Sequence, residues 1–201
     1  TFILNYNLTM LNLKHCNICP RECGINRKKQ FGFCKTSNKI KLSKVDLVNF
    51  EEPSISFKNG SGAIFFSGCN LKCVYCQNYN ISHESFGKEI SIIKLAHIMK
   101  DLQNKHADNI NLITGSHFIP QIAKALKKAK LKIPVIFNSG GYENVKALKM
   151  LEGLVDIYLP DFKYGIDEIA LKYSNCNNYI PTCLNAIKEM QRQTKNIKFS
   201  H

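Results

Sequence analysis

Short apolar runs alternate with amphipathic stretches along most of the chain. From residue 63 onward, apolar runs of four to six residues are each followed by a stretch in which apolar residues return at helical spacing. This alternation predicts parallel strands joined by right-handed helical crossovers. The predicted strands are residues 63–67, 110–114, 134–138 and 155–160. The pattern therefore predicts an α/β sheet or barrel.

The amphipathic stretches carry helix start signals. Ser91 has the position of an N-cap before a helix whose apolar face runs from Ile92 to Leu102. Pro120 falls in the first turn of the next helix, where its missing N–H is tolerated. Further helices are predicted for residues 145–151, 166–174 and 180–194.

Two segments outside this alternation also have strand-like patterns. Apolar and polar side chains alternate over residues 39–56, which predicts one or two strands, and residues 195–199 are predicted to open another. Residues 1–14 have no clear period and begin without Met, so Met10 is a candidate start. We divide the chain into an unassigned tail (1–14), a Cys-rich segment (15–58) and a core (59–201).

Polar residues that could form a site follow each of the four core strands. They are the cysteines after residue 67, then Thr114-Gly115-Ser116-His117, Asn138-Ser139-Gly140-Gly141 and Asp161-Phe162-Lys163. In parallel α/β folds, chemistry collects in the loops at the carboxyl ends of the strands. We therefore expect these four segments to form one site.

Residues 67–78, which we call the cysteine loop, contain three closely spaced cysteines. Cys69, Cys73 and Cys76 stand at i, i+4 and i+7. Three thiolates can each bind one iron of a [4Fe-4S] cluster, which leaves the fourth iron open to a substrate or cofactor. Zinc is the alternative, with His83 as a fourth ligand. Spacing alone favours the cluster only slightly.

A second set of cysteines lies in the Cys-rich segment. Cys16, Cys19, Cys23 and Cys34 follow one another at short separations. Four soft ligands suit a closed metal site, either zinc or a second iron-sulfur centre, and four buried thiols are the alternative. Of the remaining two cysteines, Cys183 falls on the apolar face of a predicted helix, and Cys176 has the sequence context of an exposed loop thiol.

Composition narrows the functional classes. Nine cysteines is an odd number, seven of them have metal-type spacing, and no signal peptide is evident, so we expect a reducing cytoplasm. No apolar run approaches the roughly 20 residues that span a bilayer.

The net charge of +13 allows a zinc-stabilised nucleic-acid-binding module as an alternative function. Lysines scattered over helix faces and only three arginines argue against nucleic acid, and seven metal-bound thiolates would lower the protein charge to +6.

The cysteine loop has a family resemblance. Its sequence, SGCNLKCVYCQN, closely resembles the cluster loop of radical S-adenosylmethionine (SAM) enzymes, and from about Cys16 onward the chain is similar to the branch related to pyruvate formate-lyase activating enzyme. This resemblance implies a partial (β/α) barrel, truncated at its C-terminus. It also implies reductive cleavage of SAM, a flavodoxin- or ferredoxin-type reductant, and a glycyl radical enzyme or other protein as substrate. A relative that keeps the fold and metal without catalysis is a further alternative.

The resemblance also assigns roles to the strand-end residues. Tyr75 would pack near the adenine of SAM. Asp161-Phe162-Lys163 resembles the family's D-x-K motif, and Asn138-Ser139-Gly140 resembles the motif that binds a monovalent cation together with the aspartate. Thr114-Gly115-Ser116-His117 stands where activating enzymes carry Gly-Gly-Glu, so the contact to the SAM amino group differs here. The SAM-binding candidates are Tyr75, Thr114, Ser116, His117, Asn138, Ser139, Asp161 and Lys163.

Overall fold

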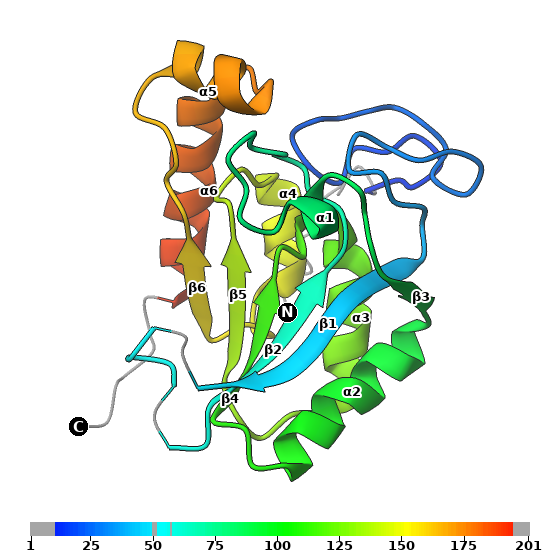
Figure 1. The fold of residues 1–201 in the computed structure, drawn as a ribbon, viewed down its shortest axis with the longest axis vertical. Helices are drawn as coiled ribbons and strands as arrows, with labels where there is room; N and C mark the ends of the chain where they lie inside the picture. Colours follow the sequence, from blue (N-terminus) through cyan, green and yellow to red (C-terminus); the bar gives the residue numbers. More distant parts are fainter. Residues whose placement is uncertain (1–10, 50–51, 57, 195–201) are drawn as a thin grey trace, which may run out of the picture.

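One mixed sheet organises the part of the chain that the computed structural model describes, residues 11–49, 52–56 and 58–194. Its six strands have the order β3-β1-β2-β4-β5-β6 (Figure 1). They are β1 (Ile40–Val48), β2 (Ser61–Phe66), β3 (Lys88–Ile90), β4 (Asn109–Ile113), β5 (Val135–Ser139) and β6 (Ile157–Pro160). Strands β2, β4, β5 and β6 are parallel, whereas β1 pairs antiparallel with β2 and β3.

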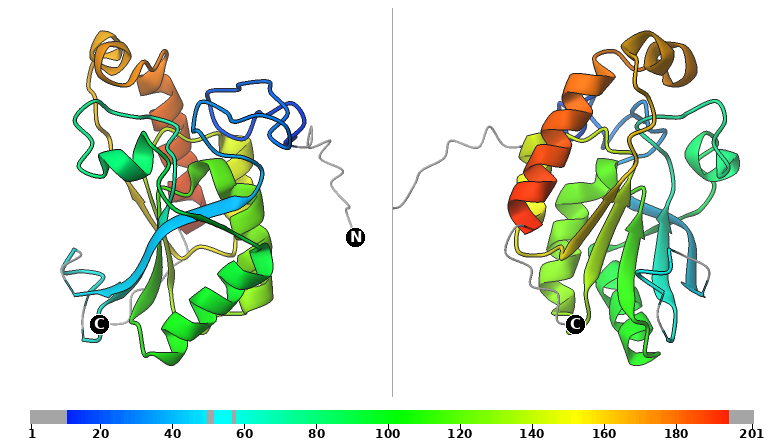
Figure 2. Two further views of the ribbon diagram at one scale, coloured as in Figure 1. Left: turned by 45° about the vertical axis from the view of Figure 1, so that its right-hand side comes forward. Right: turned by 90° about the vertical axis from the view of Figure 1, so that its left-hand side faces the viewer.

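Helices connect the parallel strands and pack together. They are α1 (Tyr79–Ser82), α2 (Ile92–Asn104), α3 (Ile119–Ala129), α4 (Val145–Leu148), α5 (Asp167–Ser174) and α6 (Tyr179–Thr194), with 3-10 turns η1 (Ser116–Phe118) and η2 (Lys149–Leu151). Figure 2 shows that α3, α4 and α6 lie on the same face of the sheet. Residues 15–38 of the Cys-rich segment form loops beside the carboxyl ends of the core strands. In the described residues, no helix is long and apolar enough to cross a bilayer.

The helix signals of the sequence are confirmed at α2 and α3. The Ser91 side chain accepts a hydrogen bond from the Lys94 N–H at 3.1 Å, so it caps α2. Pro120 lies in the first turn of α3. The core buries the apolar faces of both helices against the sheet, with Leu95 and Met99 fully enclosed. The predicted alternation of strands and helices is thus the observed one from α2 to α6.

The antiparallel edge of the sheet was not predicted. The sequence predicted one or two strands between residues 39 and 56, and among the described residues of this range the structure forms one strand, β1. Strand β3 is only three residues long and includes exposed Lys88 and Glu89, so it has no apolar alternation to reveal it. The α/β class is confirmed. The strand predicted at residues 195–199 lies outside the described residues, as does most of the tail.

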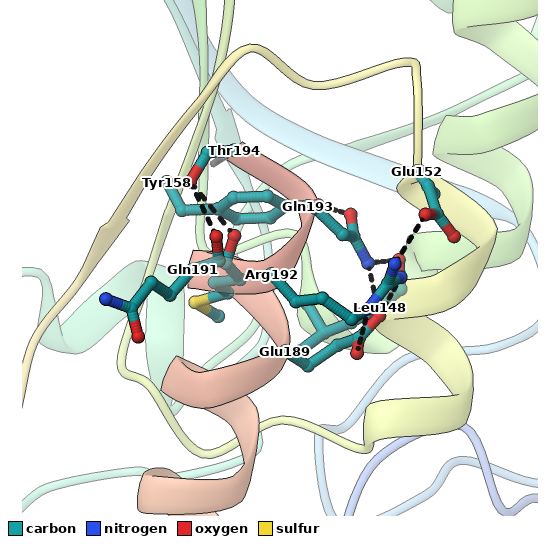
Figure 3. Close-up of polar contacts among 9 residues, drawn as sticks. Leu148, Glu152, Tyr158, Glu189, Gln191, Arg192, Gln193 and Thr194 are labelled. Atoms are coloured by element: carbon teal, nitrogen blue, oxygen red, sulfur yellow. Dashed lines mark hydrogen bonds and ion pairs between the residues drawn. The ribbon is translucent and has the colours of Figure 1, made fainter. Parts of the chain in front are cut away.

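Polar contacts fix the end of α6 against its neighbours (Figure 3). The Tyr158 hydroxyl on β6 donates to Gln193 at 2.6 Å, and the Gln193 amide donates to the Leu148 carbonyl at 3.1 Å. Arg192 bonds both Glu189 and Glu152 at 2.8 Å. Since Arg192 and Glu152 are about half exposed, their pair contributes little to stability. The part-buried hydrogen bond of Tyr158 connects β6 to this end of α6.

Candidate functional site

A cavity of about 520 Å³ opens at the carboxyl ends of the four parallel strands. All three cysteines of the cysteine loop line it. Further polar lining residues come from the cysteine loop and from the carboxyl ends of β4, β5 and β6, where the sequence predicted site residues. The lining includes Cys69, Cys73, Tyr75, Cys76, Gln77, Asn78, Thr114, Asn138, Ser139, Asp161 and Lys163. Four segments that are far apart in sequence therefore meet at one place.

Close contact with the Cys-rich segment shapes the start of the cysteine loop. Gly68 has a φ of +80°, and a Cβ atom there would stand 2.2 Å from the Cys34 carbonyl oxygen. Only glycine fits this approach. The Ser67 hydroxyl donates to the Phe86 carbonyl at 2.5 Å, which holds the other side of the loop. The first cysteine is thereby fixed directly after β2.

The three cysteines are neighbours, and the Cys69 thiol is costly to ionise in the protein alone. Burial raises the pKa of Cys69 to about 11, and repulsion from Cys73 and Cys76 adds to the effect. The Leu71 N–H donates to Cys69 Sγ at 3.3 Å, and the Ser174 hydroxyl donates to Cys73 Sγ at 3.0 Å. Cationic iron would offset the cost of the thiolates. A set of three thiol ligands beside a cavity fits a [4Fe-4S] cluster with one open iron.

His83, the alternative fourth ligand, is engaged elsewhere. Its Nδ1 lies 2.8 Å from the Ser82 hydroxyl, its Nε2 lies 3.1 Å from the Lys72 carbonyl, and its ring stacks on Tyr79. Both ring nitrogens thus have partners. Among the residues that the structure describes, no group of three or more His, Cys, Asp or Glu side chains is arranged to hold a single metal ion.

An ion pair lies at the rim of the cavity. Lys163 Nζ is 2.6 Å from Asp161 Oδ2, and the Lys163 N–H donates to the Tyr179 hydroxyl at 2.7 Å. Burial disfavours the charged form of Lys163, but its hydrogen bond and charge pairing with Asp161 outweigh this, so the pKa of Lys163 is raised. Tyr75 is half exposed at the rim and makes an edge contact with Tyr164 at 6.2 Å between ring centroids. Both charges and one aromatic face are available to a ligand.

Ser116 and His117, two of the SAM-binding candidates, lie behind the cavity wall. The 3-10 turn η1 directs both side chains into the interior, where each is 1% exposed. His117 Nε2 lies 2.8 Å from the Ser67 carbonyl. Burial, together with the charge of Arg27, lowers the pKa of His117 to about 3, so the ring is neutral. His117 therefore fastens the cysteine loop rather than facing the cavity.

Glu143 is a buried carboxyl group that the sequence analysis missed. Its Oε1 accepts a hydrogen bond from the Ser116 hydroxyl at 2.6 Å, and its Oε2 has no hydrogen-bond partner in the described residues. Burial raises the pKa of Glu143 to about 7, and the bond from Ser116 opposes this rise. The only signal in the sequence is its position shortly after Gly140 and Gly141, at the end of a strand.

The four cysteines of the Cys-rich segment are also neighbours. The Phe33 N–H donates to Cys23 Sγ at 3.4 Å, and Cys34 Sγ lies 3.0 Å from the Thr36 hydroxyl. Burial raises the pKa of Cys19, and repulsion from Cys34, Cys16 and Cys23 adds to this rise. A metal at these four thiols stays a prediction.

Two arginines that the sequence analysis did not single out attach the Cys-rich segment to the core. Arg21 donates to the carbonyls of Asn70 and Ser174, each at 2.7 Å. Arg27 is fully buried, and its guanidinium donates to the His117 carbonyl at 2.6 Å. Both arginines thus bind backbone carbonyls near the cavity.

The two remaining cysteines are both buried. Cys183 lies in the core, as predicted. Cys176 was expected to be an exposed loop thiol, and this expectation is wrong, because the residue is 0% exposed. Asn175 adopts a left-handed conformation with φ +47° at the end of α5, and the Cys176 N–H bonds back to the Ala170 carbonyl. This turn directs the thiol inward.

Comparisons with known proteins agree with an iron-sulfur site. Residues 59–161 match the model of a family described as "4Fe-4S single cluster domain". Over 176 residues, 83% of this chain, the sequence is 34% identical to the uncharacterized protein MJ0674 of Methanocaldococcus jannaschii. The match covers 50% of that protein, so the chain spans about half the length of this curated relative.

Proposed function

The chain belongs to the 4Fe-4S single cluster domain family, and from this premise we propose that it is a radical SAM enzyme. The family match supports a [4Fe-4S] cluster. The match covers Cys69, Cys73 and Cys76, and we assign the cluster to these residues. The open sheet would then be part of a (β/α) barrel of radical SAM type.

A single observation carries this proposal. The three cysteines line the same cavity as polar side chains from the ends of β4, β5 and β6. A closed structural site needs no such cavity, whereas an iron with an open position needs room for the ligand that completes it. SAM would bring an amino and a carboxylate group to that iron. Reductive cleavage of SAM to methionine and a 5′-deoxyadenosyl radical, which abstracts hydrogen from the substrate, is the chemistry that the cluster supplies when bound.

The protein residues bind and orient SAM in this proposal. The Lys163 ammonium can attract a carboxylate, and the Asp161 carboxylate with the Asn138 and Ser139 oxygens can hold a monovalent cation beside it. Thr114 also lines the cavity. Tyr75, at the rim, offers an aromatic face to the adenine.

The wider biological role is an extension of the same proposal. The resemblance to pyruvate formate-lyase activating enzyme suggests a backbone glycine of a partner enzyme as substrate, and a flavodoxin- or ferredoxin-type protein as reductant. A reducing cytoplasm is part of the same proposal, because cysteines that ligate a cluster have to stay reduced. Since the chain spans half of its curated relative, we propose this role for the whole protein rather than for the described residues alone.

Product analysis tests the proposal. The protein is reconstituted anaerobically with iron and sulfide, reduced with dithionite and incubated with SAM, and methionine and 5′-deoxyadenosine are quantified. We expect both products in equal amounts, and neither from Cys73→Ala. Cys176→Ala, which removes a buried thiol outside the cavity, should retain the activity. A protein that binds a cluster but forms neither product would overturn the proposal in favour of a relative without catalysis.

A further inference from the structure

Cys73 receives a hydrogen bond from a distant part of the chain. Ser174, the last residue of α5, lies 101 residues further along, and its hydroxyl is 3.0 Å from Cys73 Sγ. Cys73 is 5% and Ser174 is 2% exposed. Because both side chains are almost fully buried, the hydrogen bond to the sulfur has little competition from solvent.

The direction of this hydrogen bond follows from proton counting. A thiolate bound to iron has no proton, so Cys73 Sγ can only accept, and Ser174 must donate its single hydroxyl proton. The Tyr164 hydroxyl lies 2.5 Å from Ser174 Oγ. Since the Ser174 proton points to Cys73, the Tyr164 hydroxyl donates to Ser174. The three residues thus form a directed chain from Tyr164 through Ser174 to Cys73, in which each bond strengthens the next.

Backbone contacts hold Ser174 in place. Arg21, from the Cys-rich segment, bonds the carbonyls of Ser174 and Asn175 at the end of α5 and the carbonyl of Asn70 in the cysteine loop. The Val74 N–H, next to Cys73, donates to the Tyr173 carbonyl at 2.9 Å. The end of α5 and the cysteine loop are therefore fixed to each other on both sides of the Ser174–Cys73 contact.

We propose that Tyr164 and Ser174 are positioning residues that set the reduction potential of the cluster at Cys73, and that Arg21 maintains their alignment. The proposal rests on the assignment of the cluster to Cys69, Cys73 and Cys76. Reduction adds negative charge to the cluster and its sulfurs, so a donated hydrogen bond stabilises the reduced state more than the oxidised state. The chain of hydroxyls therefore raises the potential.

A redox titration of the reconstituted protein tests this directly. The midpoint potential is measured without SAM, by electron paramagnetic resonance (EPR) of samples poised at defined potentials. We expect Ser174→Ala to lower the ratio of reduced to oxidised cluster about tenfold at a fixed ambient potential, which is a shift of about −59 mV for one electron. Tyr164→Phe should shift the potential in the same direction by less. Ser174→Thr keeps the hydroxyl and should restore the potential toward that of the unmodified protein.

Two further variants separate this effect from a loss of structure. Ser61→Ala removes another fully buried serine hydroxyl, which bonds Asn109 at 2.7 Å at the opposite end of β2, and should leave the potential unchanged. Arg21→Gln should lower the potential, and combining it with Ser174→Ala should add little, because both act through one contact.

The outcomes also distinguish this inference from the proposed function. If Ser174→Ala and Tyr164→Phe bind the cluster at unchanged potential, the inference fails, whether or not SAM is cleaved. If the potentials shift as expected but the unmodified protein does not cleave SAM, the proposed function fails and the inference stands. If Ser174→Ala does not assemble a cluster, the potentials of Tyr164→Phe and Ser174→Thr test the inference instead. It stands if Tyr164→Phe has a lowered potential and Ser174→Thr does not, and it fails if Tyr164→Phe has the potential of the unmodified protein. If the unmodified protein takes up no cluster, both are overturned.

Discussion

Lys163 Nζ lies 2.6 Å from Asp161 Oδ2 at the rim of the cavity that the three cysteines line. The Asp161 side chain is 60% exposed and the Lys163 side chain 27% exposed, so the pair contributes little to folding. In the proposed function, the Lys163 ammonium would attract the SAM carboxylate and the Asp161 carboxylate would hold a monovalent cation beside it. We therefore propose that the pair serves ligand binding rather than stability.

Asp161→Asn is predicted to weaken SAM binding. Loss of the carboxylate charge should reduce the affinity about tenfold, equivalent to about 1.4 kcal/mol, because a charge-assisted contact is lost. The free energy of unfolding should change by less than about 1 kcal/mol. Equilibrium dialysis with the reconstituted protein measures the affinity.

Asp46→Asn is the matched control for this prediction. Asp46 pairs with Lys44 at 2.8 Å on β1, and both side chains are exposed. Asp46 does not line the cavity, so this variant should bind SAM like the unmodified protein. An Asp161→Asn protein with unaltered affinity would remove Asp161 from the SAM site.

Glu143 is predicted to make stability fall as the pH rises. Burial raises its pKa from 4.5 to about 7, so the folded protein retains a proton that the unfolded chain has lost. The stabilising contribution is present below pH 4.5 and is lost as the pH rises through about 7. Between pH 4.5 and 7.5, the unmodified protein should lose up to about 3 kcal/mol of unfolding free energy that Glu143→Gln does not lose.

The difference between the two proteins is the quantity to measure, by anaerobic urea unfolding at several pH values. His117 has the opposite sign, because its pKa is lowered from 6.5 to about 3, and its contribution is lost as the pH falls. Both proteins contain His117, so its effect cancels in the difference. Parallel stability curves over this pH range would show that Glu143 does not titrate there.

Arg27→Lys is predicted to destabilise the fold. The buried guanidinium donates to the Ser37 carbonyl, the His117 carbonyl and the Thr36 hydroxyl at 2.6 to 3.1 Å. A lysine ammonium cannot reproduce this planar arrangement, and unsatisfied buried acceptors remain. We expect a loss of about 2–4 kcal/mol in the free energy of urea unfolding. Arg192→Lys, at a half-exposed ion pair, should change the unfolding free energy much less than Arg27→Lys does. Equal losses in the two variants would contradict the role given to Arg27.

The central strands and helices could be predicted from the sequence, because the spacing of apolar residues along each segment shows which side chains are buried. Strands β2, β4 and β5 are covered on both faces, which produces continuous apolar runs, and α2 has a helical apolar period with a serine cap. The cavity was predicted in outline, because parallel strands bring their carboxyl ends to one edge. The pairing of β1 with β3 could not be predicted. Strand β3 has only three residues, two of them charged, so its sequence does not indicate which strand it pairs with.

The side chains behind the cavity could not be predicted for a different reason. Arg27 and Glu143 are charged residues, which a local pattern assigns to the surface, yet each is no more than 2% exposed. Their burial depends on partners far along the chain, such as the His117 carbonyl 90 residues from Arg27. The same is true of Ser174, whose contact with Cys73 spans 101 residues. Local periodicity contains no information about such pairs.

The open iron is the central claim, and EPR tests it most directly. The reconstituted, reduced protein is measured with and without SAM, beside Cys73→Ala. We predict a [4Fe-4S] signal that changes on addition of SAM, since SAM occupies the open iron, and the loss of this signal in the variant. A protein that holds tetrahedral zinc at Cys69, Cys73 and Cys76, or a cluster signal that SAM leaves unaltered, would contradict the account.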